Sequence, residues 1–155
     1  MKVASAALRP LTVGRVRIRF FFRRRMDLAA TAPLRTSSGD IPISTPEMTA
    51  YDLLRYRKGA GSIDHVATVL AELAERLDAK KLLAVARAGG ELPVIQRLGY
   101  LLERTGHTEL ASRLASLVRA RTTRMVPLEP RSTDAVSARD PKWRVLVNTT
   151  VAVEP

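Results

Sequence analysis

Between Thr45 and Arg121 the sequence repeats one pattern: a residue able to cap a helix, apolar side chains at helical spacing, and often a glycine. Apolar residues at this spacing form one buried face of an amphipathic helix. The pattern predicts five successive helices, over residues 45–55, 62–77, 78–89, 92–106 and 108–121. Because each helix is short and must bury its apolar face, we expect a helical bundle at the centre of the fold.

Residues at the expected helix ends support these boundaries. Thr45 can cap the first helix, Pro46 suits its first position, and Glu47 is expected to face the positive end of the helix dipole. Gly99 lies inside the fourth helix, where glycine costs about 1 kcal/mol relative to alanine. We interpret it as the site of a close contact with another helix.

Alternating residues on either side of the bundle predict strands. The segment 15–25, RVRIRFFFRRR, places Val16, Ile18 and Phe20 on one face and nearly all of its arginines on the other. We expect the apolar face to pack on the core. Residues 142–148 alternate in the same way, and residues 124–128 form a short strand with Pro127 at an edge position.

The predicted fold class is α+β, a helical bundle of about five helices with a small β-sheet formed by N- and C-terminal strands. Residues 27–43 and 129–141 are expected to be loops, apart from a marginal strand signal at 41–44. A length of 155 residues predicts a single domain, 1–155, in which residues 1–10 are the candidate for a flexible tail.

Composition excludes several classes of protein. Hydrophobic residues make up 46% of the chain, which is too many for intrinsic disorder throughout. The absence of cysteine excludes disulfides and thiol chemistry. No apolar run is long enough for a membrane span or a secretory signal, so we expect a cytoplasmic protein that does not enter a membrane.

Positive charge is concentrated near the N-terminus. The chain has 26 Lys and Arg against 15 Asp and Glu, a formal charge of +11. Residues 1–40 hold nine basic and two acidic groups, whereas residues 41–155 hold seventeen and thirteen. This asymmetry points to an acidic partner such as nucleic acid. A net charge also favours solubility, so the charge alone leaves both explanations open.

Two groups of arginines are the candidate contacts to DNA. If the arginine strand and the end of the last helix lie side by side, they form one patch that neutralises several phosphates, with salt-sensitive and largely sequence-independent binding. Two plainer explanations stay open: a charged edge strand that discourages aggregation, and arginines favoured by a helix C-terminus. The candidate residues are Arg15, Arg17, Arg19, Arg23, Arg24, Arg25, Arg119, Arg121 and Arg124.

The sequence offers little for catalysis. It has no nucleophile elbow and no glycine-rich phosphate loop with its lysine. His65 and His107 stand at helix starts, where a polar terminus residue is the simpler interpretation, and the carboxylates are scattered along solvent faces. We therefore expect no enzyme, no catalytic residue, no metal site and no cofactor.

The order of segments resembles one known family, from about residue 8 to residue 148. The pieces that carry the resemblance are ISTPEMTAYDLLRY at 43–56, PVIQRLGYLLE at 93–103 and DPKWRVLVN at 140–148. Together they resemble the C-terminal domain of AbiEi-type antitoxins, from type IV toxin–antitoxin and abortive-infection systems that act in phage defence. Tyr51, Asp52, Tyr100 and Trp143 match as fold positions, and no catalytic residue carries over.

The resemblance implies a function. Members of this family pair a winged helix-turn-helix with this domain, repress their own operon by binding DNA, and counter a nucleotidyltransferase toxin encoded nearby. The winged helix has no matching segment in this sequence, which leaves open a late start codon or a stand-alone antitoxin module. The leading hypothesis is an antitoxin module whose partner is the cognate nucleotidyltransferase toxin. The alternative is a nucleic-acid-binding transcriptional regulatory domain, a fragment of an autorepressor.

Overall fold

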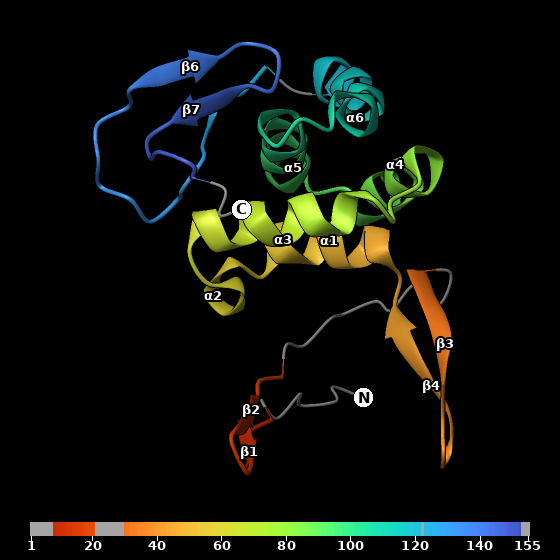
Figure 1. Cartoon of the computed structure of the whole chain (residues 1–155). Coiled ribbons are helices and arrows are strands. Elements are labelled where there is room, and N and C mark those ends of the chain that lie inside the picture. Colours follow the sequence, from red (N-terminus) through yellow and green to blue (C-terminus); the bar gives the residue numbers. More distant parts are fainter. Residues whose placement is uncertain (1–7, 21–29, 122, 153–155) are drawn as a thin grey trace, which may run out of the picture.

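The computed structural model of the chain describes residues 8–20, 30–121 and 123–152. Figure 1 shows the helices stacked in the middle of the molecule, the C-terminal strands on one side and two hairpins on the other. The helices are α1 (Pro46–Arg55), α2 (Arg57–Ala60), α3 (Ile63–Ala74), α4 (Ala79–Gly89), α5 (Leu92–Arg104) and α6 (Thr108–Arg121). The strands are β1 (Leu11–Val13), β2 (Val16–Ile18), β3 (Thr31–Thr36), β4 (Gly39–Ser44), β5 (Val126–Pro127), β6 (Ala138–Asp140) and β7 (Val145–Val147).

The predicted α+β class and the five longer helices are confirmed. The side chains of Thr45, Ser62 and Asp78 each accept a hydrogen bond from a backbone N–H in the first turn of α1, α3 and α4. These bonds satisfy donors that a helix start leaves free, which explains why the helices begin there. The helix predicted over residues 62–77 is α3, which ends at Ala74, three residues before the predicted end. The short helix α2 lies in the turn that was expected between α1 and α3.

Helix α5 is the centre of the core. Its residues from Val94 to Leu102 are all buried, because α1, α3, α6 and β7 surround it. A helix covered on every side must also satisfy its polar residues internally. Gln96 does so, since its Nε2 donates to the backbone carbonyls of Arg124 at 2.9 Å and Arg144 at 3.0 Å. This side chain fixes the C-terminal segments against the bundle.

Glu47 lies in the first turn of α1, as predicted, and it is also buried. Its side chain is only 3% exposed, and its Oε1 accepts a hydrogen bond of 3.0 Å from the backbone N–H of Asp78. The carboxylate therefore joins the start of α1 to the start of α4. A buried acidic group needs such a donor, because burial without one is costly.

The prediction of one sheet shared by both termini is wrong. The described strands form three separate units: the antiparallel hairpin β1–β2, the antiparallel hairpin β3–β4, and a small mixed sheet in the order β5–β7–β6. Strand β7 pairs parallel with β5, as Val126 lies opposite Val145. The N-terminal strands thus pair with their own sequence neighbours, which costs less chain entropy than pairing with the distant C-terminus.

The arginine strand is shorter than predicted and does not cover the core. Only Val16–Ile18 of the segment 15–25 is a described strand, and Val16 and Ile18 remain 62% and 39% exposed. The positions 21–25 lie outside the described residues. Alternation alone predicts a half-buried strand, but among the described residues no core layer covers the apolar face of the hairpin, and its residues are exposed.

Two expected loops contain strands. Residues 31–36 form β3, which pairs with β4 so that Pro33 lies opposite Pro42. An isolated hairpin tolerates proline, since an edge strand has unpaired donors in any case. Residues 138–140 form β6. Conversely, the predicted strand 142–148 is regular only over Val145–Val147, because residues 141–144 form a turn in which Arg144 has a φ of 55°.

The close contact expected at Gly99 exists, but its partner is not a helix. The indole ring of Trp143, from the turn before β7, lies over the glycine. Trp143 is fully buried, and its Nε1 donates to Glu103 one turn further along α5. The C-terminal sheet is therefore anchored to α5 at Gln96, at Gly99 and at Glu103.

Candidate functional site

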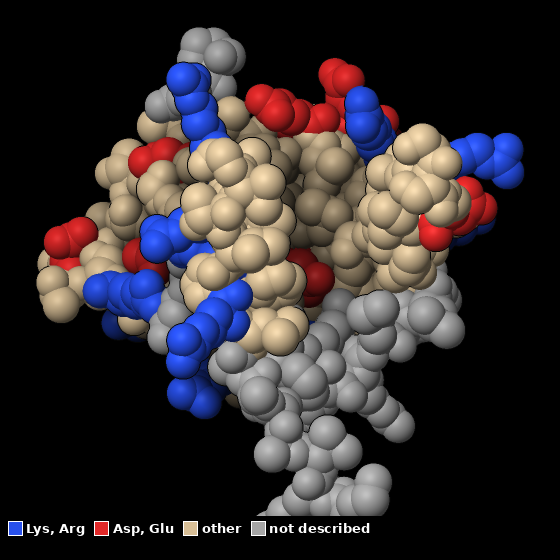
Figure 2. Space-filling view, turned by 90° about the horizontal axis from the view of Figure 1, so that it is seen from below, with Lys and Arg blue, Asp and Glu red and all other residues tan. Residues whose placement is uncertain are grey.

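The β1–β2 hairpin carries the arginines of the first candidate group. Arg15 follows Gly14 in the turn, Arg17 lies on β2, and Arg19 follows the strand. All three are exposed, and Figure 2 shows basic side chains around this projecting hairpin. Exposed apolar residues share the hairpin; they are Leu11, Val13, Val16 and Ile18. The hairpin thus presents charge and apolar surface together.

The second candidate group lies elsewhere. Arg119 and Arg121 are exposed at the end of α6, and Arg124 is exposed just before β5. Figure 1 places α6 and the β1–β2 hairpin on opposite sides of α1 and α3. The single patch that would unite both groups is therefore not formed. The positions 23–25 lie outside the described residues.

The basic residues of the C-terminal segment serve partly to hold the structure. The Lys142 Nζ donates to the Glu103 carboxylate at 2.5 Å and lies 5.5 Å from the centre of the Trp143 ring. The ammonium group of Lys142 is therefore already engaged by an acidic and an aromatic side chain within the protein. On the face shown in Figure 2, acidic and basic side chains are interspersed away from the β1–β2 hairpin.

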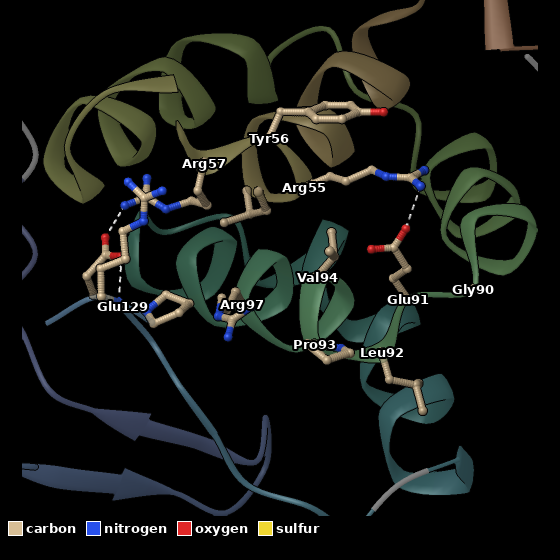
Figure 3. A pocket seen from close by; sticks show the side chains of 13 residues that line it. Arg55, Tyr56, Arg57, Gly90, Glu91, Leu92, Pro93, Val94, Arg97 and Glu129 are labelled. Atoms are coloured by element: carbon tan, nitrogen blue, oxygen red, sulfur yellow. Dashed lines mark hydrogen bonds and ion pairs between the residues drawn. The ribbon is translucent and has the colours of Figure 1, made fainter. Parts of the chain in front are cut away.

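A cavity of about 770 Å³ opens between the end of α1, the start of α5 and the segment after β5. Its volume is typical of sites that bind small molecules. Figure 3 shows side chains of these three elements converging on it. The lining residues are Leu54, Arg55, Tyr56, Arg57, Gly90, Glu91, Leu92, Pro93, Val94, Arg97, Glu129, Pro130 and Arg131.

Two ion pairs stand at opposite ends of this cavity. Arg55 contacts Glu91 at 2.7 Å, and Arg57 is paired with Glu129. The Arg57 side chain is 12% exposed, and its Nε is buried without a hydrogen-bond partner. With Arg97 and Arg131 added, the lining has four arginines and two glutamates, which leaves two positive charges in excess.

Arg97 lies between the two ion pairs in Figure 3. It is only 9% exposed, and its Nε donates to the Pro127 carbonyl at 2.8 Å. Within the described part of the chain, neither terminal nitrogen of this guanidinium has a hydrogen bond. Burial lowers the pKa of Arg97, Glu129 opposes that effect in part, and Arg57 adds to it. A buried guanidinium whose two terminal nitrogens have no hydrogen bond can donate to an anion.

Glu129 is held rigidly on the wall of the cavity. Asn148 accepts from the Glu129 N–H at 2.9 Å and donates to the Glu129 carbonyl at 2.8 Å. Asn148 is itself buried, so this backbone pairing is protected from water. These hydrogen bonds fix the backbone of this part of the wall.

This cavity is not predicted by any pattern that was followed along the sequence. Its charged residues come from three separate segments, and each looks like an ordinary surface position. One signal was present: Arg97 is three residues after Val94 and four before Leu101, so it shares the apolar face of α5. An arginine in such a stripe must be buried or distort the packing.

His65 and His107 stand at the starts of α3 and α6, as predicted. In the described ranges, no three His, Asp or Glu side chains gather as metal ligands would. Among these same residues, no helix combines the length and the apolar character required to cross a bilayer.

Comparisons with known proteins give a family and a fold. Residues 1–104 match the model of a family described as the AbiEi antitoxin C-terminal domain. A crystal structure of the RV2827C protein from Mycobacterium tuberculosis has a similar fold, with a TM-score of 0.53 and 17% identity over 70% of this chain. The chain spans 36% of that protein's length. No curated protein matches the sequence.

Proposed function

The chain belongs to the AbiEi antitoxin C-terminal domain family, and on this premise we propose that it is an antitoxin module that counteracts a nucleotidyltransferase toxin. The observation that carries the proposal is the family match over residues 1–104, which takes in both hairpins and helices α1 to α5. The proposal includes a cytoplasmic location for the chain.

The surface best suited to the proposed role is the β1–β2 hairpin. It projects from the bundle and combines arginines with exposed apolar side chains, a composition common in recognition surfaces. Exposed apolar side chains that no described residue covers often mark an interaction surface. We assign to it contact with the toxin or with nucleic acid bound by the toxin.

A growth assay tests the antitoxin role. Cells would express the nucleotidyltransferase encoded beside this chain's gene, with and without the chain. The proposal predicts that the chain restores growth, and that a variant with an unfolded core, such as Leu98→Asp, does not. Failure of the soluble, folded chain to protect would overturn it.

A second candidate function is a nucleic-acid-binding regulatory domain, part of an autorepressor. The exposed Arg15, Arg17 and Arg19 favour it, because three guanidinium groups on one hairpin can contact successive phosphates. Arg119, Arg121 and Arg124 form a separate basic group at the opposite side, and Arg23, Arg24 and Arg25 follow the hairpin in the chain.

Measuring DNA binding and protection from the toxin in the same variant distinguishes the two functions. Charge reversal of the hairpin arginines abolishes DNA binding if the regulatory function is correct. If protection from the toxin survives that change while DNA binding is lost, the antitoxin role does not depend on nucleic-acid contact.

A further inference from the structure

The arginine-lined cavity has no part in the functions proposed above. It is lined by the end of α1, the start of α5 and the segment after β5, and none of its lining residues belongs to the β1–β2 hairpin (Figure 3). Elements distant in sequence build it, and the Asn148–Glu129 hydrogen bonds fix one of its walls. A cavity with fixed walls pays little ordering cost when a ligand enters.

Its chemistry selects an anion. Arg97 is nine-tenths buried, yet only its Nε is used by the protein. A planar guanidinium with two free terminal nitrogens matches two oxygens of a phosphate or carboxylate group. The amino end of α5 opens on the same cavity, where its side-chain cap is absent and its dipole adds positive potential.

Charge balance favours phosphate over carboxylate. The lining side chains carry two positive charges in excess, because Glu91 and Glu129 neutralise only two of the four arginines. A phosphate monoester carries a charge of about −1.5 to −2 at neutral pH, whereas a carboxylate carries one. The phosphate therefore compensates the cavity more completely.

The rest of the cavity favours an organic body on the phosphate. Apolar side chains of Leu54, Leu92 and Val94 line it, and Tyr56 contributes an aromatic ring. A volume of about 770 Å³ far exceeds that of an inorganic phosphate ion. Apolar walls beside a cationic group are typical of sites for amphipathic small molecules.

We propose that this cavity binds a small organic phosphate monoester, with Arg97 as the principal anion-binding residue. The terminal nitrogens of Arg97 donate to two phosphate oxygens, and Arg131 at the rim adds charge. The organic group lies against Leu92, Val94 and Tyr56. This binding is a property of the chain by itself and does not require the toxin.

Phenyl phosphate is a suitable probe, because it has the required charge and an aromatic body. The full 155-residue chain would be titrated and followed by backbone amide NMR shifts. We expect saturable shifts at residues 90–97 and 129–131. Benzoate and inorganic phosphate serve as comparisons, and each is expected to bind at least about tenfold more weakly.

Three variants place the binding in the cavity. Arg97→Gln is expected to weaken phenyl phosphate binding by about tenfold or more, and Arg131→Gln by a few-fold. Glu91→Gln is expected to strengthen it a few-fold, because it removes a carboxylate that competes for Arg55. Arg113→Gln is the matched control, since this exposed residue on α6 does not line the cavity.

Arg97→Gln loses the hydrogen bond to the Pro127 carbonyl, and this loss alone could unfold the protein. Glu91→Gln keeps the test valid in that case, because it changes a half-exposed side chain and is expected to strengthen the binding of phenyl phosphate. The proposal is overturned if phenyl phosphate produces no saturable shifts. It is also overturned if benzoate binds equally well, or if Arg113→Gln weakens binding as much as the cavity variants do. None of these results bears on growth protection, so the antitoxin role is tested separately.

Discussion

The indole of Trp143 occupies the space that a side chain at position 99 would need. A Cβ placed on Gly99 would lie 1.9 Å from Cζ3 of the Trp143 ring and 2.3 Å from Cη2. Both residues are in the centre of the core, and the ring joins the C-terminal sheet to α5. The absence of a side chain at position 99 is thus a condition for this packing.

Gly99→Ala is therefore expected to destabilise the protein by about 3 kcal/mol, despite the better helix propensity of alanine. Trp143→Leu removes the obstacle. In that background, Gly99→Ala should be neutral or stabilise by up to about 1 kcal/mol. Urea unfolding followed by circular dichroism measures all four corners of this cycle. Equal costs of Gly99→Ala in both backgrounds would contradict the contact.

The same relationship shows what sequence reasoning could and could not reach. A glycine inside a helical stripe correctly indicated close packing, since only such a contact repays its cost. The sequence indicates a helix as the partner of Gly99, because the segments before and after its own helix are also predicted to be helical. Trp143 comes from a turn 44 residues away in the sequence, and residues 142–148 had been predicted as a regular strand. The local sequence pattern indicates that position 99 makes a close contact, but it does not indicate which residue makes that contact.

Helices and strands differed in predictability for a physical reason. The helix boundaries follow from caps that act within three residues, as at Thr45, Ser62 and Asp78. Strand pairing depends on distant segments, and the alternation at residues 16–18 carries no information about whether a core layer covers it. The arginine cavity depends on three separated segments, so only the misplaced charge of Arg97 in an apolar stripe could indicate it.

Gln96 is expected to be essential for docking the C-terminal sheet. Its Nε2 is the shared donor for the carbonyls of Arg124 and Arg144, and its side chain is 1% exposed. Gln96→Leu removes this donor and should cost about 2 kcal/mol. Gln96→Glu sets a carboxylate against the two carbonyls and should cost more.

Urea unfolding measures these costs, and fluorescence of the single tryptophan reports whether the sheet stays in place. Ser116→Ala on the outer face of α6 is the control, with an expected change below about 0.5 kcal/mol. A Gln96→Glu variant as stable as the wild type would contradict the assigned contacts.

Glu103 makes stability depend on pH. Hydrogen bonds from Lys142 and then from the Trp143 Nε1 hold the pKa of this carboxyl below its ordinary value, more than burial raises it. A lowered pKa means that the stabilisation is present above the ordinary carboxyl range and is lost as the pH falls through the folded-state pKa.

Glu103→Gln should accordingly cost about 0.5–1 kcal/mol at pH 6, a small effect because the pair is partly exposed. The variant and the wild type should then converge as the pH falls from 6 to 3. Urea midpoints at three pH values across this range give the comparison. A constant difference across the range would show that the charge of Glu103 does not contribute.

The β1–β2 hairpin is expected to govern any binding to DNA. Changing Arg15, Arg17 and Arg19 to Glu should abolish detectable duplex binding near physiological salt, since three phosphate contacts become repulsive. Their replacement by Gln should lower the slope of log K against log salt by about 2–3. Circular dichroism should be unchanged, because all three side chains are exposed.

The matched control replaces exposed arginines on α4, α5 and α6 in the same number: Arg87, Arg104 and Arg113. Fluorescence anisotropy with a labelled duplex, repeated at several salt concentrations, measures both sets. Equal losses for the two sets would mean that net charge alone, rather than the hairpin, attracts the DNA.

Protection of cells from the toxin tests the central claim most directly. With the nucleotidyltransferase toxin held at a constant level, the amount of this chain would be raised stepwise and colony formation counted. We expect protection to rise with the amount of folded chain, and we expect the core variant Leu98→Asp to give none. Continued cell death at every level of a soluble, folded chain would contradict the antitoxin function.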